Sequence, residues 1–171
     1  GEEWRRGWHP EKIKPRKTEQ AALVVGSGPA GLECSMQLAR RGYHVILSEG
    51  ASELGGRVLL ESDLKGLSAW KRVVDNRVYE IQQKTNIEIY RESELTLSHI
   101  NELDVNNIFI ATGSNWRVDG IGRSRRKEIT GLDNIQVLTP TDAIRKQDSI
   151  KDPLVIYDDD QGYLAGVIAD H

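Results

Sequence analysis

The residues with the clearest chemical potential are three glycines spaced as Gly26-x-Gly28-x-x-Gly31. They follow the short apolar run 21–25 and open a segment that has the pattern of a helix. Glycines at this spacing permit a tight turn, let a diphosphate approach the backbone and let the helix lie close to the sheet. The N-terminus of the helix offers free N–H groups and a partial positive charge to phosphate. The candidate pyrophosphate-binding residues are Gly26, Ser27, Gly28, Pro29, Ala30 and Gly31.

A carboxylate stands where the ribose of such a nucleotide would lie. Glu49 ends the next predicted strand, 44–48, and lies 18 residues after Gly31. An acid at this place accepts hydrogen bonds from both ribose hydroxyls of an adenosine and repels a 2′-phosphate. We therefore expect an adenine nucleotide, ADP or FAD, rather than an NADP-type ligand. The alternative for Glu49 is an exposed carboxylate at the end of a strand.

Two further glycine turns are candidates for the same site. Gly55 and Gly56 permit a second close backbone approach, and Arg57 after them would balance the charge of a diphosphate, although an ordinary turn is an equal alternative. The turn Ala111-Thr112-Gly113 follows the predicted strand 107–111, at the sheet edge where ligands gather in open α/β sheets. The last candidate cofactor contact is Leu95.

The elements around these turns predict an α/β fold. Strand, helix and strand follow one another within 21–48, which is the pattern of a right-handed βαβ unit. A loop is expected at 51–67, a helix at 68–84 and a strand at 87–90. The predicted class is a Rossmann-like parallel sheet with flanking helices, and it is incomplete.

The chain is expected to contain three parts. Residues 1–18 are polar and form an irregular lead-in, and residues 19–150 form the nucleotide-binding module. Residues 151–171 are the start of a second, truncated NAD-like module, and Asp152-Pro153 mark the boundary. The chain has no initiator Met and stops within a predicted helix, so we expect it to be a piece of a longer polypeptide.

The second module shows a pattern that does not suit NAD(P)H. A strand is predicted at 154–157 and a helix at 162–170, and the turn between them carries Asp158, Asp159 and Asp160. Three carboxylates repel a diphosphate where a nicotinamide site needs glycines. A solvated turn is favoured over a metal site there, and the basic cluster at 123–127 is interpreted as a solvated loop.

Composition excludes several classes of function. A net charge of −3 gives no attraction to nucleic acid, and no apolar stretch is long enough to span a membrane, so we expect a cytoplasmic protein with neither partner. The single cysteine, Cys34, cannot form an internal disulfide or a cysteine cluster, and we expect it to pack against the sheet. Neither His44 nor His99 has a suitably spaced partner, so no catalytic group is predicted.

Four features, in their order along the chain, resemble the two-dinucleotide-binding flavoproteins, which implies an FAD/ADP-binding module of that type. They are the Gly-x-Gly-Pro-Ala-Gly turn, Glu49, the Gly-Gly pair and the Ala-Thr-Gly turn. The opening segment 1–11, Gly66-Leu67 with Trp70, and Trp116 with Asp119 and Gly120 narrow the resemblance. They resemble the C-terminal nucleotide-binding region of the trimethylamine, dimethylamine and histamine dehydrogenase-like branch of the NADH:flavin oxidoreductase family. These iron–sulfur flavoproteins are related to old yellow enzyme.

This resemblance implies a larger oxidoreductase that acts on an N-methylated or other amine. An N-terminal barrel with FMN and a 4Fe-4S cluster would precede this chain, which alone would be inactive. The resemblance implies bound ADP in the amine-dehydrogenase branch and FAD in the NADPH-dependent dienoyl reductases. A structural or interaction module that binds nothing is the third alternative. The implied partners are the adenine nucleotide, the remainder of the parent chain and a second copy in a homodimer.

Overall fold

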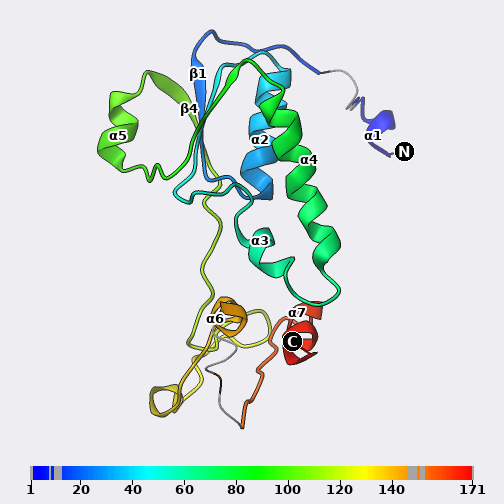
Figure 1. The fold of residues 1–171 in the computed structure, drawn as a ribbon, viewed down its shortest axis with the longest axis vertical. Coiled ribbons are helices and arrows are strands. Elements are labelled where there is room, and N and C mark those ends of the chain that lie inside the picture. The colour runs from blue at the N-terminus through cyan, green and yellow to red at the C-terminus, as the bar shows by residue number, and fades with distance from the viewer. Residues whose placement is uncertain (1, 8, 10–12, 146–149, 151–152, 171) are drawn as a thin grey trace. The chain divides into compact units, whose positions relative to one another are not determined.

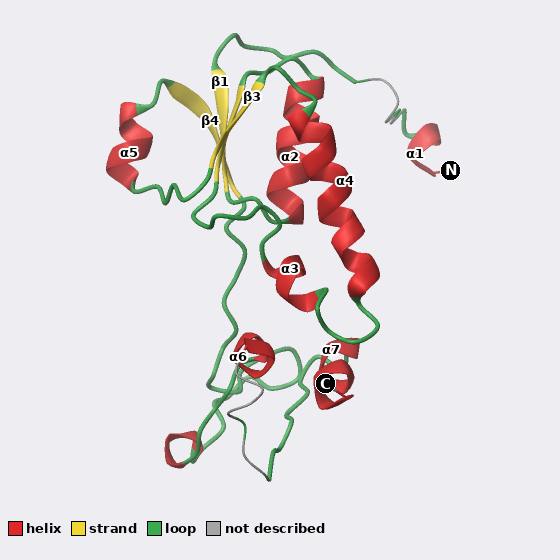
Figure 2. Cartoon of the chain, in the orientation of Figure 1, coloured by secondary structure: helices red, strands yellow, loops and turns green. Residues whose placement is uncertain are grey.

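The computed structural model describes residues 2–7, 9, 13–145, 150 and 153–170. The chain divides into two compact units (Figures 1 and 2). Unit 1 consists of Gly1–Gly56 and Arg72–Gly113, and unit 2 consists of Arg57–Lys71 and Ser114–His171.

Unit 1 is built on a parallel sheet of four strands in the order β3-β2-β1-β4 (Figure 2). The strands are β1 (Ala21–Val25), β2 (Val45–Ser48), β3 (Ile87–Tyr90) and β4 (Val105–Ile110). Since all four run in the same direction, their carboxyl ends lie along one edge. The predicted Rossmann-like parallel sheet is confirmed.

Two helices cover one face of this sheet, α2 (Pro29–Arg40) and α4 (Lys71–Gln82) (Figure 1). Proline occupies the first turn of α2, where its missing N–H costs no helical bond. Burial of Leu32 and Met36 on α2 against the strands stabilises the unit, by about 1.5–3 kcal/mol for each large apolar side chain. Arg77 of α4 donates to Glu33 of α2 at 2.8 Å and joins the two helices.

Unit 1 also contains two short helices that the sequence pattern did not indicate. Helix α1 (Glu2–Arg5) interrupts the lead-in that we expected to be irregular, and residues 1, 8 and 10–12 of that lead-in lie outside the described part. Helix α5 (Leu97–Glu102) lies between β3 and β4, and Thr96 caps it by accepting from His99 N at 3.4 Å. His99 Nδ1 in turn accepts from Thr96 N at 3.3 Å, so the role of His99 here is helix capping.

The regular elements among the described residues of unit 2 are all short helices or 3₁₀ turns. Unit 2 contains α3 (Arg57–Glu61), α6 (Pro140–Arg145) and α7 (Tyr163–Asp170), with the 3₁₀ turns η1 (Ser68–Trp70) and η2 (Leu132–Asn134). The expected loop at 51–67 was wrong in part, because α3 occupies its middle.

The prediction of a strand at 154–157 was wrong. These residues form no strand, and Val155 is 86% exposed. A strand needs a hydrogen-bonded neighbour, and unit 2 offers none across the range that the structure describes. The predicted helix that follows is present as α7. Asp152 of the expected module boundary lies outside the described residues, so the division into 19–150 and 151–171 stays a prediction.

None of the helices in the described ranges combines the length and the apolar character that a bilayer crossing requires.

Candidate nucleotide-binding site

The glycine turn begins where β1 ends, and Gly26 is fixed there by two neighbouring strands. Its N–H donates to the carbonyl of Ser48, at the end of β2, at 2.8 Å. A Cβ at Gly26 would lie 2.5 Å from the carbonyl oxygen of Ala111 and 3.0 Å from Cα of Thr112. Its φ of +98° is also one that side chains disfavour. The Ala-Thr-Gly turn thus lies directly against the first glycine, as the parallel strands require.

Gly31 brings the first turn of α2 close to the sheet. A Cβ at this position would overlap the carbonyl oxygen of Gly26 and would lie 3.3 Å from Cβ of Ala111. No residue larger than glycine fits without moving the helix. The predicted packing role of the third glycine therefore has a direct geometric basis.

Gly28 differs from the other two glycines because the space that a side chain would occupy there is open. It is the N-cap of α2 with φ −62° and ψ 176°, and a Cβ there would meet no atom within 4 Å. No side chain caps the 12-residue helix and its first turn holds no acidic residue. Pro29 is half-buried and Ala30 is exposed. Open backbone at an uncapped helix N-terminus is the arrangement that accepts an anionic group.

The Gly55-Gly56 pair packs against the glycine turn at 26–31. Gly55 N donates to the carbonyl of Ser27 at 2.9 Å. A Cβ at Gly56 would lie 3.1 Å from Cα of Gly28, and both residues of the pair have positive φ. The pair therefore packs against the glycine turn, and its contact with a nucleotide stays a prediction.

Glu49 is hydrogen-bonded to the glycine turn. Its Oε2 accepts from the N–H of Ser27 at 2.8 Å and from the Ser27 hydroxyl at 2.5 Å, and its Oε1 accepts from Ala51 N at 2.8 Å. Burial raises the pKa of this carboxyl, but the hydrogen bonds from Ser27, Ala51 and Gly50 outweigh it and hold the pKa below its ordinary value. Glu49 is therefore ionised at neutral pH, beside the turn.

The remaining candidates take different places. Gly113 is exposed with φ +79°, and Leu95 is half-buried in the segment between β3 and α5. Arg57 begins unit 2, where its guanidinium donates to the carbonyl of Ser114 and lies 5.0 Å from the ring centre of Trp116. Binding of a nucleotide by Leu95, Arg57 and Gly113 stays a prediction.

Sequence reasoning assigned Ser27 to the turn but missed its link to Glu49. The available signal was a hydroxyl residue directly after Gly26 together with an acid at the end of the neighbouring strand. Because β1 and β2 are paired in parallel, these two ends meet.

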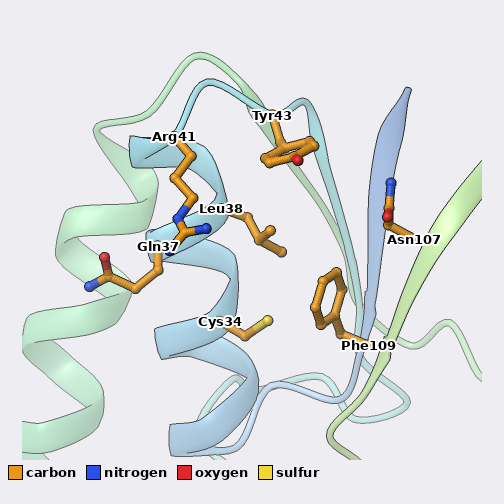
Figure 3. Close-up of a pocket in the computed structure, with 7 residues that line it drawn as sticks. All are labelled: Cys34, Gln37, Leu38, Arg41, Tyr43, Asn107 and Phe109. Atoms are coloured by element: carbon orange, nitrogen blue, oxygen red, sulfur yellow. The ribbon is translucent and has the colours of Figure 1, made fainter. Parts of the chain in front are cut away.

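Cys34 lies apart from the glycine turn. It is half-buried in a hollow between α2 and β4, where its side chain and that of Phe109 both point (Figure 3). The residues lining this hollow are Cys34, Gln37, Leu38, Arg41, Tyr43, Asn107 and Phe109. Burial raises the pKa of the Cys34 thiol, so the unreactive protonated form is favoured. This agrees with a packing role, although the side chain is only partly covered.

In unit 2, the aspartate run and the basic cluster bind each other. Asp159 accepts from the backbone N–H groups of Ser124 at 3.0 Å and Arg125 at 3.1 Å. Partial burial raises the pKa of Asp159, but these N–H groups and the Tyr157 hydroxyl hold it below its ordinary value. Asp160 lies 3.6 Å from Arg123. The interpretation of both segments as solvated turns was incomplete, because Asp159 anchors the loop at 122–125.

This anchor makes a testable prediction. Asp159→Ala should loosen the loop at 122–125, since two backbone N–H groups lose their acceptor, and trypsin should cleave at the arginines of this loop several-fold faster. Limited proteolysis followed by mass spectrometry measures the rate. The matched control is Asp158→Ala, because among the described residues the Asp158 side chain bonds within its own turn alone, to Gln161 N at 2.9 Å. Equal cleavage of Asp159→Ala and wild type would contradict the anchor.

Two solved structures and one curated relative are similar over nearly the whole chain. Histamine dehydrogenase from Rhizobium sp. 4-9 is 44% identical with a TM-score of 0.87, over 96% of this chain and 24% of that one. The 6-hydroxypseudooxynicotine amine oxidase from Pseudomonas geniculata N1 is 41% identical with a TM-score of 0.86, over 99% of this chain and 25% of that one. Dimethylamine dehydrogenase from Hyphomicrobium sp. (strain x) is 34% identical over 99% of this chain and 24% of its own length.

These relatives are oxidoreductases that act on amines by name, and the chain spans about a quarter of their length. The predicted resemblance to the amine-dehydrogenase branch is confirmed. The sequence pattern described as Pyridine nucleotide-disulphide oxidoreductase matches residues 17–156, which include the glycine turn, Glu49 and the Ala-Thr-Gly turn. The chain belongs to the pyridine nucleotide-disulphide oxidoreductase family.

Proposed function

We propose that this chain is the adenine-nucleotide-binding module of an amine-oxidising iron–sulfur flavoprotein and that it holds ADP. The observation that carries the proposal is the open backbone of Gly28 at the uncapped start of α2, enclosed by the second glycine pair. A diphosphate is the ligand that such a glycine-rich helix start accepts. The ionised Glu49 beside it supplies an acceptor for the ribose.

The aspartate run supports ADP over a working nicotinamide system. Asp159 is committed to the backbone of Ser124 and Arg125, and a Cβ at Gly122 would overlap its carboxylate. The segment that would form a second dinucleotide turn therefore carries a carboxylate bound to its own chain. This favours the amine-dehydrogenase branch over the NADPH-dependent reductases.

The rest of the proposed enzyme follows from its relatives. Histamine dehydrogenase and dimethylamine dehydrogenase act on amines by name, and we assign an amine substrate to the parent of this chain. FMN and a 4Fe-4S cluster, both bound outside this chain, would supply the redox chemistry of the parent. We further propose a cytoplasmic homodimer that binds neither nucleic acid nor membrane.

The identity of the nucleotide tests this function. The purified protein is denatured, and the released nucleotides are identified and counted by mass spectrometry. We expect one ADP per chain. One FAD per chain together with reduction by NADPH would support the dienoyl-reductase alternative and overturn the proposal. A protein that carries no adenine nucleotide and gains no thermal stability from added ADP would be a structural module.

The ribose assignment gives a mutational prediction. Glu49→Arg should weaken ADP binding at least about tenfold, because a hydrogen bond to a charged acceptor contributes about 1.5–3 kcal/mol. Titration calorimetry on nucleotide-free protein measures the affinity. Glu102→Arg makes the same charge change on the exposed surface of α5 and should bind as wild type does. If Glu49→Arg retains wild-type affinity, the carboxylate does not bind the ribose.

A further inference from the structure

Ser27 is a completely buried residue between two half-buried glycines of the site. It is 0% exposed although it lies between Gly26 and Gly28. Its N–H and its hydroxyl both donate to a single atom, Oε2 of Glu49. The side chain of Ser27 therefore points at the carboxylate and away from the open face of the turn.

The hydrogen bonds of Glu49 leave little free capacity. An ionised carboxylate offers about four acceptor positions, two on each oxygen. Ser27 fills both positions on Oε2, Ala51 N–H fills one on Oε1, and the backbone N–H of Gly50 is a further donor to this carboxylate. Any acceptor position that is left for a ligand therefore lies on Oε1. The lowered pKa of Glu49 agrees with a carboxylate that is held ionised by these donors.

We propose that Ser27 is a positioning residue, which turns the Glu49 carboxylate so that Oε1 alone is left to accept a hydrogen bond from one ribose hydroxyl. The inference rests on the proposed function and deepens it by naming the residue that sets the ribose contact. It also changes the expectation from the sequence: Glu49 accepts a hydrogen bond from one ribose hydroxyl instead of both.

The effect of Ser27 should depend on the ribose. Without the hydroxyl, Glu49 loses one of the two donors on Oε2, and its carboxylate can rotate. The contact with the ribose hydroxyl weakens, whereas the diphosphate contacts at Gly28 and the start of α2 do not involve Ser27's side chain. Loss of Ser27 should therefore affect ADP but not an analogue that lacks both ribose hydroxyls.

The test compares Ser27→Ala with wild type by calorimetry on nucleotide-free protein, with ADP and with 2′,3′-dideoxy-ADP. We expect Ser27→Ala to bind ADP about tenfold more weakly and the dideoxy analogue as wild type does. The matched control is Ser35→Ala in α2, since Ser35 is also 0% exposed and its hydroxyl has no hydrogen-bond partner in the described residues. This control should bind both ligands as wild type does.

A double-mutant cycle shows whether Ser27 acts through Glu49. On a Glu49→Gln background, Ser27→Ala should cost little further ADP affinity, because the group that it positions is already altered. Additive losses would overturn the proposal, as would equal losses for ADP and the dideoxy analogue.

Wild-type protein offers a second measurement that needs no variant. With Oε1 alone left to accept from the ribose, 2′-deoxy-ADP and 3′-deoxy-ADP should lose affinity unequally, and equal losses would contradict the inference. If wild type binds no ADP at all, the proposed function and this inference fall together. If wild type binds ADP and Ser27→Ala binds it equally well, this inference alone falls.

Discussion

Replacing Gly31 by alanine should destabilise unit 1 by about 3 kcal/mol, at the upper end of what overpacking costs. The added methyl group would overlap the carbonyl oxygen of Gly26 and press on Cβ of Ala111. The carbonyl oxygen of Gly26 belongs to the backbone, so it cannot rotate away from the methyl group as the end of a long side chain can. The helix would have to leave the sheet, and the burial of Leu32 and Met36 depends on that contact.

Chemical denaturation of nucleotide-free protein measures this loss, read as a lower midpoint at unchanged slope. Gly50→Ala provides the control for the added methyl group, since nothing lies within 4 Å of a Cβ there. The control should unfold at the wild-type midpoint or slightly above it. Wild-type stability of Gly31→Ala would mean that α2 does not lie as close to the sheet as the structure places it.

The glycine turn and the first βαβ unit could be predicted from sequence because their signals are local. The strand at 21–25 was predicted with the bounds of β1, and Pro29 marked the start of α2. Parallel pairing then places the ends of β1, β2 and β4 along one edge, which brings Glu49 and Ala111 to the turn.

The errors arose where local patterns depend on distant partners. The apolar run at 154–157 has the composition of a strand, but a strand also needs a neighbour, which the described part of unit 2 does not provide. Helix α3 follows two glycines and was hidden by their loop-like composition. The anchoring of Ser124 by Asp159 joins positions 35 residues apart and leaves no periodic signal in the sequence.

The sequence predicts that Ser27 and Glu49 lie close together, but it does not predict the direction of the Ser27 hydroxyl. Sequence puts both residues at the carboxyl edge of the sheet. It does not say whether the serine hydroxyl faces the ligand or the carboxylate, because that depends on the backbone torsions of the turn. The buried position of Ser27 resolves this point.

Gly28→Ala should abolish most ADP binding while leaving the fold intact. This result would show that Gly28 serves nucleotide binding and not the stability of the fold. Position 28 has space for a methyl group and a φ of −62° that alanine adopts freely. The methyl group would stand over the backbone at the point where we expect the diphosphate to approach. We expect the affinity for ADP to fall about 100-fold, which corresponds to about 2.8 kcal/mol.

Two measurements on nucleotide-free protein distinguish a loss of ADP binding from a loss of stability in Gly28→Ala. Thermal unfolding without ligand should show Gly28→Ala as stable as wild type or slightly more stable, because alanine lowers the entropy of the unfolded chain. Added ADP should raise the unfolding temperature of wild type but not of the variant at the same concentration. An unaltered response to ADP would show that the diphosphate does not lie over Gly28. A variant that is already unstable without ligand would show that this glycine serves the fold, as Gly31 does.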